Sequence, residues 1–388
     1  MSERIPLAEP RMFGAEAPYL AECVATNWVS SAGPFVERFE RQLGKITGVR
    51  HAVACSTGTA AIHVALLAAG VEPEDEVLVP DLTFVATACA VRYCGAWPVL
   101  IDAEPAHWQM DVDKALQFLE RECVWQGGRL VNRATGRRVR AILPVHLLGH
   151  PVDMAPLRDV AARLGLAIVA DAAEALGAGY RGEPIARAAD VAAISFNGNK
   201  VVTAGGGGVV LTDDEHLAAR VRYLTTQAKD DAVEGVHGAI GFNYRLTNLQ
   251  AAVGVAQLEH LDECLASKRR SAAHYARTLA DLPLTLPREA TWATSSWWLY
   301  TVLVDETRFG LDRPRVMRAL AERGIETRPL WAPVSTQKPF ANCQAYRIEH
   351  AGDLHRRSLS LPSSVGITQA QHDTVTDALR QIHENAQR

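Results

Sequence analysis

The residues best suited to chemistry lie in the segment ISFNGNKVVTAGGGG, residues 194–208, where Lys200 follows a predicted strand and precedes four glycines. A lysine amine in a rigid setting that lowers its pKa can form a Schiff base. The alternative is a solvated surface lysine beside a glycine turn, which is the commoner situation for this residue type. Taken alone, the segment favours the surface lysine.

A second segment, ACSTGTAAIHVALLAAG at 54–70, places hydroxyl residues between a predicted strand and a predicted helix. The free amides of the first helical turn, together with the hydroxyls of Ser56, Thr57 and Thr59, could bind a phosphate. A plain helix cap without a ligand explains the same pattern equally well.

A third segment, LAIVADAAEALGAG at 166–179, ends a buried strand on Asp171. Ligands of open α/β sheets bind at the carboxyl ends of such strands, and a buried carboxylate there needs a cationic or hydrogen-bonding partner. The alternative is a helix cap, because Glu174 follows Asp171 at the spacing of a capping box.

The composition is that of an ordinary globular protein: 388 residues, 48% hydrophobic, 22% charged, with a net charge of −4. It excludes disorder, collagen and coiled coil, and it gives no overall field that would attract nucleic acid or an anionic membrane. The seven cysteines form no CxxC pair, which fits a reducing compartment. The uncharged run 52–71 is interrupted by polar residues and the amino terminus lacks a signal-peptide core, so we expect a cytoplasmic protein without a membrane span.

Short apolar strands alternate with helical segments from about residue 50 to 225, which predicts an α/β fold with a largely parallel sheet covered by helices. The expected strands are 51–56, 76–80, 97–102, 139–145, 166–171, 191–196 and 207–213, and the helices between them are 58–69, 84–94, 111–121 and 153–164. Residues 126–138, rich in Gly and Arg, are expected to form an exposed loop.

The pattern changes after residue 225, where helices are expected at 247–262, 266–280, 314–324 and 368–384 and a strand at 295–305. This mixture predicts a smaller α+β domain at residues 261–388 after a large domain at 1–260.

Three further motifs are judged not to be functional sites. GAGYRG at 177–182 matches a dinucleotide-binding pattern, but Pro184 disfavours the helix that such a site needs. His146 and His150 flank a turn, so no metal site is expected. The pair Trp297–Trp298 is expected to lie in the core and at an interface.

Taken together in order, NWVSSAGPFVERFE (27–40), STGTAAIHVAL (56–66), ADAAEALGA (170–178), SFNGNK (195–200) and GFNYRLTNLQAAVG (241–254) resemble the DegT/DnrJ/EryC1/StrS family of pyridoxal-phosphate sugar aminotransferases. The resemblance covers nearly the whole chain and reverses the preference for a solvated Lys200. It implies the type I aminotransferase fold, with pyridoxal 5'-phosphate as cofactor and its pyridoxamine form in the second half of the reaction.

The resemblance also implies roles for individual residues. Lys200 matches the Schiff-base lysine, which later acts as acid and base, and Asp171 would face the pyridine nitrogen and keep it protonated. The other implied cofactor contacts are Phe84 stacked on the ring, Glu174 near the cofactor hydroxyl, Gly58, Thr59 and Ser195 at the phosphate, and Asn243 reaching that phosphate from the second subunit of a homodimer. Sugar-nucleotide contacts are expected from Trp28, Ser30, Lys229, His237 and Trp331.

The expected reaction moves the amino group of L-glutamate, which leaves as 2-oxoglutarate, to C4 of a nucleotide-linked 4-keto-6-deoxy sugar. SFNGNK, WQMDV (108–112) and TTQAKDD (225–231) resemble the subgroup that acts on UDP-2-acetamido-2,6-dideoxy-4-ketohexose, for bacillosamine-type sugars and legionaminic acid. The alternatives are a GDP-perosamine-type or dTDP-sugar aminotransferase. Less favoured are a sugar dehydratase, in which histidine replaces the lysine, a non-catalytic regulator and an NAD-dependent enzyme.

Overall fold

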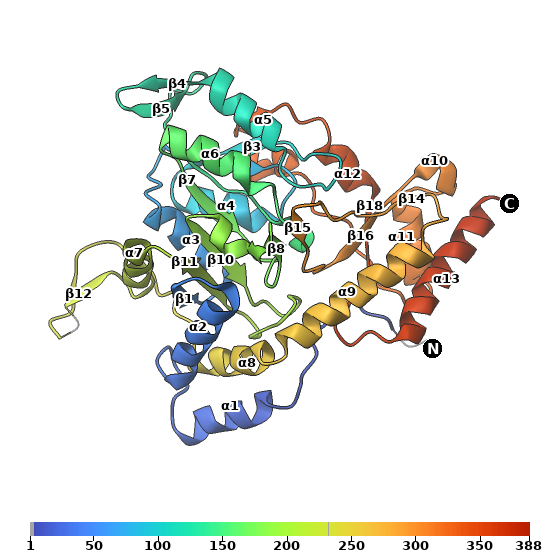
Figure 1. The fold of residues 1–388 in the computed structure, drawn as a ribbon, viewed down its shortest axis with the longest axis horizontal. Coiled ribbons are helices and arrows are strands. Elements are labelled where there is room, and N and C mark those ends of the chain that lie inside the picture. Colours follow the sequence, from blue (N-terminus) through green and yellow to red (C-terminus); the bar gives the residue numbers. More distant parts are fainter. Residues whose placement is uncertain (1–3, 232) are drawn as a thin grey trace.

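The computed structural model describes residues 4–231 and 233–388. Its centre is an eight-stranded sheet in the order β1-β11-β10-β7-β6-β2-β3-β17 (Figure 1). The strands are β1 (His51–Cys55), β11 (Gly208–Thr212), β10 (Val191–Ser195), β7 (Ala167–Asp171), β6 (Val139–Ile142), β2 (Glu76–Pro80), β3 (Trp97–Ile101) and β17 (Ala345–Tyr346). Only β11 runs antiparallel to its neighbours. The predicted α/β fold with a mixed, mostly parallel sheet is therefore confirmed.

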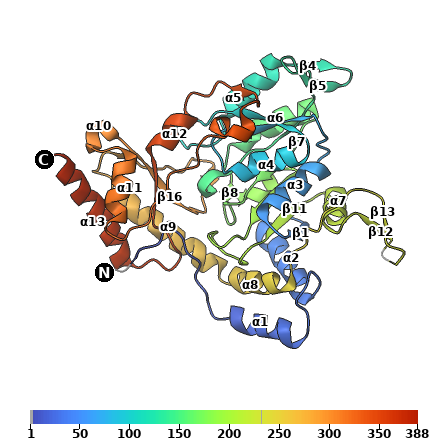
Figure 2. The same ribbon diagram turned by 180° about the vertical axis from the view of Figure 1, so that it is seen from behind.

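Helices cover both faces of this sheet (Figures 1 and 2). The helices are α1 (Glu16–Ala25), α2 (Pro34–Thr47), α3 (Gly58–Ala68), α4 (Val85–Tyr93), α5 (Val112–Gln117), α6 (Met154–Leu164), α7 (Glu215–Thr225), α8 (Asn248–Leu258), α9 (Leu261–Thr278), α10 (Glu306–Phe309), α11 (Arg313–Ala321), α12 (Ala351–Arg357) and α13 (Gln369–Ala386). Both α8 and α13 begin with a capping box, Thr247 with Gln250 and Thr368 with Gln371, which satisfies amides of their first turns.

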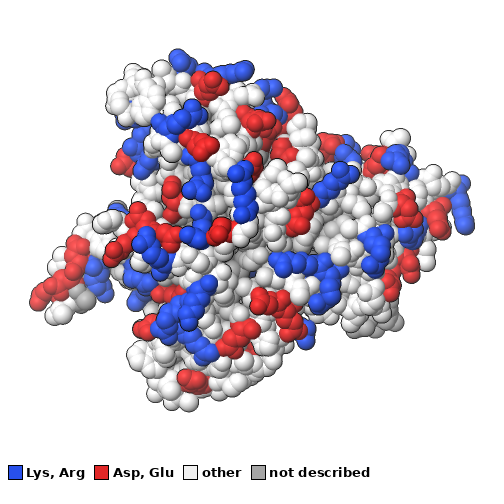
Figure 3. Space-filling view, in the orientation of Figure 1, with Lys and Arg blue, Asp and Glu red and all other residues white. Residues whose placement is uncertain are grey.

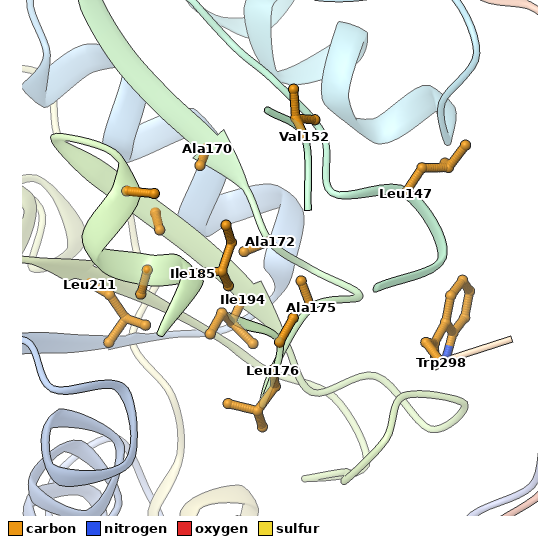
Figure 4. Packing of buried hydrophobic residues seen from close by; sticks show 14 of the residues in the cluster. Leu147, Val152, Ala170, Ala172, Ala175, Leu176, Ile185, Ile194, Leu211 and Trp298 are labelled. Atoms are coloured by element: carbon orange, nitrogen blue, oxygen red, sulfur yellow. The ribbon is translucent and has the colours of Figure 1, made fainter. Parts of the chain in front are cut away.

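The sheet is apolar on both sides because its strands are buried on both sides. Along β2, Val77 and Val79 join a hydrophobic cluster with α3, α4 and α7, whereas Leu78 between them joins a cluster with α2, α5, α6 and α8. Helix α2 contributes Phe35, Phe39 and Leu43 at intervals of four residues, so one helical face is buried. Figure 4 shows part of this cluster, with Trp298 and Leu147 at one side of it.

A three-stranded sheet, β14 (Leu284–Thr285), β16 (Tyr300–Val304) and β18 (Ser358–Leu361), forms the centre of the C-terminal part. It packs with α9, α11 and α13 around a third hydrophobic cluster that includes Tyr275, Tyr300, Phe309 and Val375, and Ile5 from the amino terminus. Helix α9 runs from the end of α8 into this part, and both chain termini lie there (Figures 1 and 2).

The expected strand 295–305 begins only at Tyr300, so its first half was predicted wrongly. Trp297 adopts a φ of +52°, which an extended strand does not allow. The amides of Ser296 and Trp298 donate to the carbonyls of Gly149 and Leu148, at 3.0 and 3.1 Å. These bonds to a distant loop bend the chain before the strand starts.

The expected loop at 126–138 also needs correction. Its first half belongs to a hairpin, β4 (Cys123–Gln126) and β5 (Arg129–Asn132). Gly127 and Gly128 form the connection with φ values of +59° and +76°, and two residues with positive φ suit the turn that matches the twist of a hairpin.

Two further hairpins complete the fold. GAGYRG runs into the hairpin β8 (Gly179–Tyr180) and β9 (Glu183–Pro184), which pairs with β15 (Ala293–Thr294), so no helix follows its glycines. The hairpin β12 (Lys229–Asp231) and β13 (Val236–His237) projects outward beside α7 (Figure 1).

Within the described residues, no helix is long and apolar enough to cross a membrane. Charges of both signs are mixed over the face seen in Figure 3.

Candidate active site

The largest concentration of predicted site residues surrounds a cavity of about 320 Å³ at the carboxyl ends of the parallel strands. Strand β7 ends on Asp171, β10 ends on Ser195, and the chain after β2 supplies Phe84. Open α/β sheets bind their ligands at this edge. The predicted residues that line the cavity are Gly58, Thr59, Phe84, Asp171, Glu174, Ser195, Lys200 and Trp331.

Lys200 lies in the loop between β10 and β11, and its side chain is only 14% exposed. Its Nζ lies 3.7 Å from Oε1 of Glu174 and 4.0 Å from the centre of the Trp298 ring. The backbone amide of Lys200 donates to the carbonyl of Asn197, which closes the turn. The amine is therefore enclosed in the cavity and is not a solvated surface charge.

Asp171 is a buried carboxylate that lines the cavity. It accepts hydrogen bonds from the Thr87 hydroxyl at 2.7 Å and from the Ala173 amide at 3.0 Å. Burial raises the pKa of Asp171, and these bonds with the charge of Lys200 offset part of that rise. Because both direct partners are neutral, the carboxylate can accept a cationic group from the cavity.

Glu174 is not the reciprocal partner of a helix cap. It is buried, and its Oε2 accepts a hydrogen bond from the Leu148 amide at 2.7 Å. Burial raises the pKa of Glu174 to about 7, although Lys200 acts in the opposite direction. The carboxyl group therefore titrates near neutral pH beside the lysine amine.

The amino end of α3 forms another wall of the cavity, through Thr57, Gly58 and Thr59. Thr57 caps the helix by accepting from the Ala60 amide at 3.0 Å. Gly58 packs so closely on Ser195 that a Cβ at this position would lie 2.8 Å from the Ser195 Cβ. A helix amino end with hydroxyl groups around it suits a phosphate.

Three aromatic rings line the cavity, and sequence reasoning assigned only two of them to the site. Trp331 stacks on Trp298, with centroids 6.1 Å apart and planes at 7°, and meets the edge of Phe84 at 6.0 Å. Trp298 is 2% exposed, as expected for a core residue, but it also lies under the Lys200 amine. No local pattern separates it from Trp297. Asn197 and Asn199, which also line the cavity, lie within SFNGNK and could have been named from that motif.

The remaining predicted residues lie outside this cavity in the single chain. Lys229 and His237 face each other on the exposed hairpin β12–β13. Asn243 is exposed and pairs with Thr226. Trp28 and Ser30 lie on the exposed segment before α2, and their main-chain carbonyls accept hydrogen bonds from the side-chain and main-chain amides of Asn248 in α8.

Two groups outside the cavity contain residue types that bind metals: the pair His146 and His150, and the cluster of Asp102, Glu349 and His350. His150 is already bonded on both ring nitrogens, to the Pro151 carbonyl and the Ala290 amide. In the described part of the chain, the one group with metal-ligand spacing is Asp102, Glu349 and His350. Nζ of Lys114 lies 2.7 Å from Asp102 and 3.0 Å from Glu349, so this lysine already provides the positive charge.

Comparison with known proteins places the chain in a family. Residues 11–380 match the DegT/DnrJ/EryC1/StrS aminotransferase family, and the chain belongs to it. It is 40% identical over 381 residues to a GDP-perosamine synthase of Caulobacter vibrioides, covering 98% of each chain. It is 36% identical over 387 residues to EpsN of Bacillus subtilis, assigned as a pyridoxal phosphate-dependent aminotransferase, covering 98% of this chain and 96% of that one.

A solved structure agrees with both the fold and the class. DesI, determined in the presence of its TDP-sugar product, superposes with a TM-score of 0.88 at 31% identity, covering 100% of this chain and 95% of that chain. The protein is therefore a pyridoxal phosphate-dependent nucleotide-sugar aminotransferase.

The residues around the cavity fit this cofactor. A buried carboxylate with only neutral direct partners suits the ring nitrogen, an enclosed lysine amine suits the aldehyde, and the amino end of α3 suits the phosphate. The cavity is accordingly a candidate active site.

Proposed function

We propose that this enzyme transfers the amino group of L-glutamate to C4 of a GDP-linked 4-keto-6-deoxy sugar, as in perosamine formation. The observation that carries the proposal is the 40% identity, over 98% of both chains, with a GDP-perosamine synthase. A UDP-linked N-acetyl sugar was expected from short motifs, and the relatives give that expectation no support. The TDP-sugar product of DesI favours dTDP-linked sugars as the second candidate.

Within the cavity, the arrangement supports the following roles. Asp171 would hold the proton of the cofactor ring nitrogen, Phe84 would stack on the ring, and Glu174 would lie near the cofactor hydroxyl. Gly58, Thr59 and Ser195 would bind its phosphate, and Trp331 would contact the sugar nucleotide. When bound, pyridoxal phosphate supplies an electron sink that stabilises negative charge at the reacting carbon.

Lys200 carries the proton chemistry in this proposal. Its Nζ would remove the proton from the α carbon of glutamate and, in the second half of the reaction, deliver a proton to C4 of the ketosugar. Its place against Glu174 and the Trp298 ring keeps the amine inside the cavity and away from bulk water.

The residues outside the cavity support a homodimer with shared active sites. Asn243, Lys229, His237, Trp28 and Ser30 would then serve the cavity of the second subunit, with Asn243 at the phosphate. Large apolar side chains exposed in the single chain are consistent with such an interface. They include Val24, Trp28, Val29, Val85, Tyr93 and Ile240.

Residues 1–260 and 261–388 would act as a large and a small domain, and the separate hydrophobic cluster around Tyr275 and Tyr300 supports this division. A cytoplasmic location fits the supply of nucleotide sugars and glutamate.

The substrate proposal is tested with a panel of GDP-, dTDP- and UDP-linked 4-keto-6-deoxy sugars, with glutamate as donor. Product masses identify amination, and kcat/KM ranks the acceptors. GDP-4-keto-6-deoxymannose should give the highest kcat/KM. A higher value for UDP-2-acetamido-2,6-dideoxy-4-ketohexose would restore the bacillosamine-type assignment, and a higher value for a dTDP sugar would favour the second candidate.

A further inference from the structure

One buried lysine has no part in the reaction as described so far. Lys268 lies within α9, is 2% exposed, and donates hydrogen bonds to the main-chain carbonyls of Trp298, at 2.9 Å, and Ser363. Among residues 4–231 and 233–388, no carboxylate lies within ion-pair distance of its amine. Burial lowers the pKa of Lys268 to about 7, which reflects the cost of a charge without a counter-ion.

The bond to Trp298 fixes a strained part of the chain. Trp297, directly before it, has a φ of +52°, a conformation that a bulky side chain adopts only where its surroundings enforce it. The Trp298 amide donates to the Leu148 carbonyl at 3.1 Å, and the Trp297 amide donates to the Ser295 hydroxyl at 3.0 Å. The hydrogen bond from Lys268 to the Trp298 carbonyl is the third bond that holds this part of the main chain.

Trp298 in turn contacts the reactive lysine. Its indole N–H donates to the carbonyl of Asn199 at 2.7 Å, one residue before Lys200. Its ring lies 4.0 Å from Nζ of Lys200. The Trp298 side chain therefore contacts both the Lys200 amine and the backbone of Asn199, the residue that precedes Lys200 in the loop.

We propose that Lys268 is a positioning residue, which sets the orientation of the Lys200 amine by fixing the main chain of Trp298. The inference rests on the proposed role of Lys200. The alternative is a purely structural role, in which the hydrogen bonds of Lys268 stabilise the fold and do not affect the Lys200 amine.

The matched pair of variants is Lys268→Met and Tyr275→Phe. Methionine keeps most of the length and apolar volume of lysine but donates no hydrogen bond. Tyr275 lies on the same helix, and its hydroxyl donates to the carbonyl of Pro362 at 2.7 Å, next to Ser363. Its loss removes a comparable buried bond that does not involve Trp298.

Both variants should unfold at a lower temperature than the wild type. Only Lys268→Met should also lower kcat, between about tenfold and a hundredfold, with KM for glutamate changed less than about twofold, because misplacement of a reacting group has effects of this size. It should also shift the pH midpoint of the visible absorption band of the bound cofactor. This band reports the lysine–cofactor linkage and needs no sugar substrate, so an error in the sugar assignment would not affect it.

If Lys268→Met keeps the wild-type kcat and the wild-type absorption midpoint, Lys268 has only a structural role and the proposal is wrong. If this variant does not fold, Lys268→Gln takes its place. The glutamine side chain is one bond shorter than that of lysine, so we expect its amide to reach only one of the two carbonyls. The kcat and the absorption midpoint of Lys268→Gln should then each change in the direction expected for Lys268→Met. A folded Lys268→Gln protein that matches the wild type in both measurements would overturn the proposal.

Discussion

At the scale of single residues, Lys200 is the group on which the proposed chemistry depends. Lys200→Ala should still bind the cofactor, since the amino end of α3 and Asp171 are untouched, but amino transfer should fall by at least about a thousandfold, within the range for loss of a positioned acid and base. Single-turnover absorbance changes with glutamate measure the first half of the reaction alone, in which glutamate gives up its amino group. Retention of more than about a thousandth of the wild-type rate would rule out the assigned role.

Glu174 gives a prediction about stability and pH. Burial raises its pKa from 4.5 to about 7, so the folded protein binds this proton more tightly than the unfolded chain does. Glu174 therefore leaves the free energy of unfolding unchanged below about pH 4.5. As the pH rises from there to about 7, ionisation of Glu174 lowers that free energy by up to about 3 kcal/mol. Glutamine can still accept the Leu148 hydrogen bond but does not titrate.

The apoprotein carrying Glu174→Gln should therefore be more stable than the wild type at pH 8, and the two should converge near pH 5. Urea unfolding at several pH values measures the difference, in which the contribution of Asp171 cancels as a first approximation. A difference in unfolding free energy that stays constant from pH 5 to pH 8 would contradict the raised pKa.

At the scale of elements, the close contact between α3 and β10 shapes the phosphate end of the cavity. In Gly58→Ala, the new Cβ would lie 2.8 Å from the Cβ of Ser195, so the amino end of α3 or the end of β10 must move. Because both segments are proposed to bind the cofactor phosphate, the dissociation constant for pyridoxal phosphate should rise by about tenfold, equivalent to about 1.4 kcal/mol. Titration of the apoprotein with the cofactor measures it.

Gly352→Ala is the matched control, since Gly352 lies in α12 and a Cβ at this position would meet no other atom within 4 Å. Alanine is the better helix former, so this change should leave cofactor affinity unchanged and keep or slightly raise stability. Equal cofactor affinity in the two variants would mean that α3 does not contact the phosphate.

At the scale of the whole molecule, the question is whether each active site uses two chains. Lys200→Ala and Asn243→Asp should each give a nearly inactive homodimer, the second because a carboxylate would repel the phosphate. Mixed in equal amounts, the chains should pair in a ratio of about 1:2:1. Half of the dimers are then mixed, and one of their two sites has both intact residues, so about a quarter of wild-type activity should return.

Differential tags on the two chains confirm that mixed dimers form and allow their purification. If Asn243 instead only braces its own chain at Thr226, each subunit carries its own defect. Mixed dimers without recovered activity would then exclude the shared site.

The sequence by itself determined seven strands of the central sheet, several of its covering helices and most of the cavity, but neither strand β17 nor helices α2 and α7. Alternating apolar strands and helices can be read locally, and Asp171, Ser195 and Phe84 lie close together because parallel strands bring their carboxyl ends to one edge. The family resemblance, supported later by the comparisons, distinguished an active lysine from a surface one. These inferences need no knowledge of contacts between distant residues.

Only the tertiary structure decided the place of Trp298 and the environment of Glu174. Trp298 was expected within a regular strand, but its amide donates to the Leu148 carbonyl and its carbonyl accepts from Lys268. These bonds to residues distant in sequence bend the chain and place its ring under the Lys200 amine. Glu174 has the spacing of a helix cap, yet burial raises its pKa to about 7, while Lys200 and the hydrogen bond from the Leu148 amide offset part of that rise. Both outcomes depend on hydrogen bonds and desolvation between segments far apart in the chain, which local spacing does not encode.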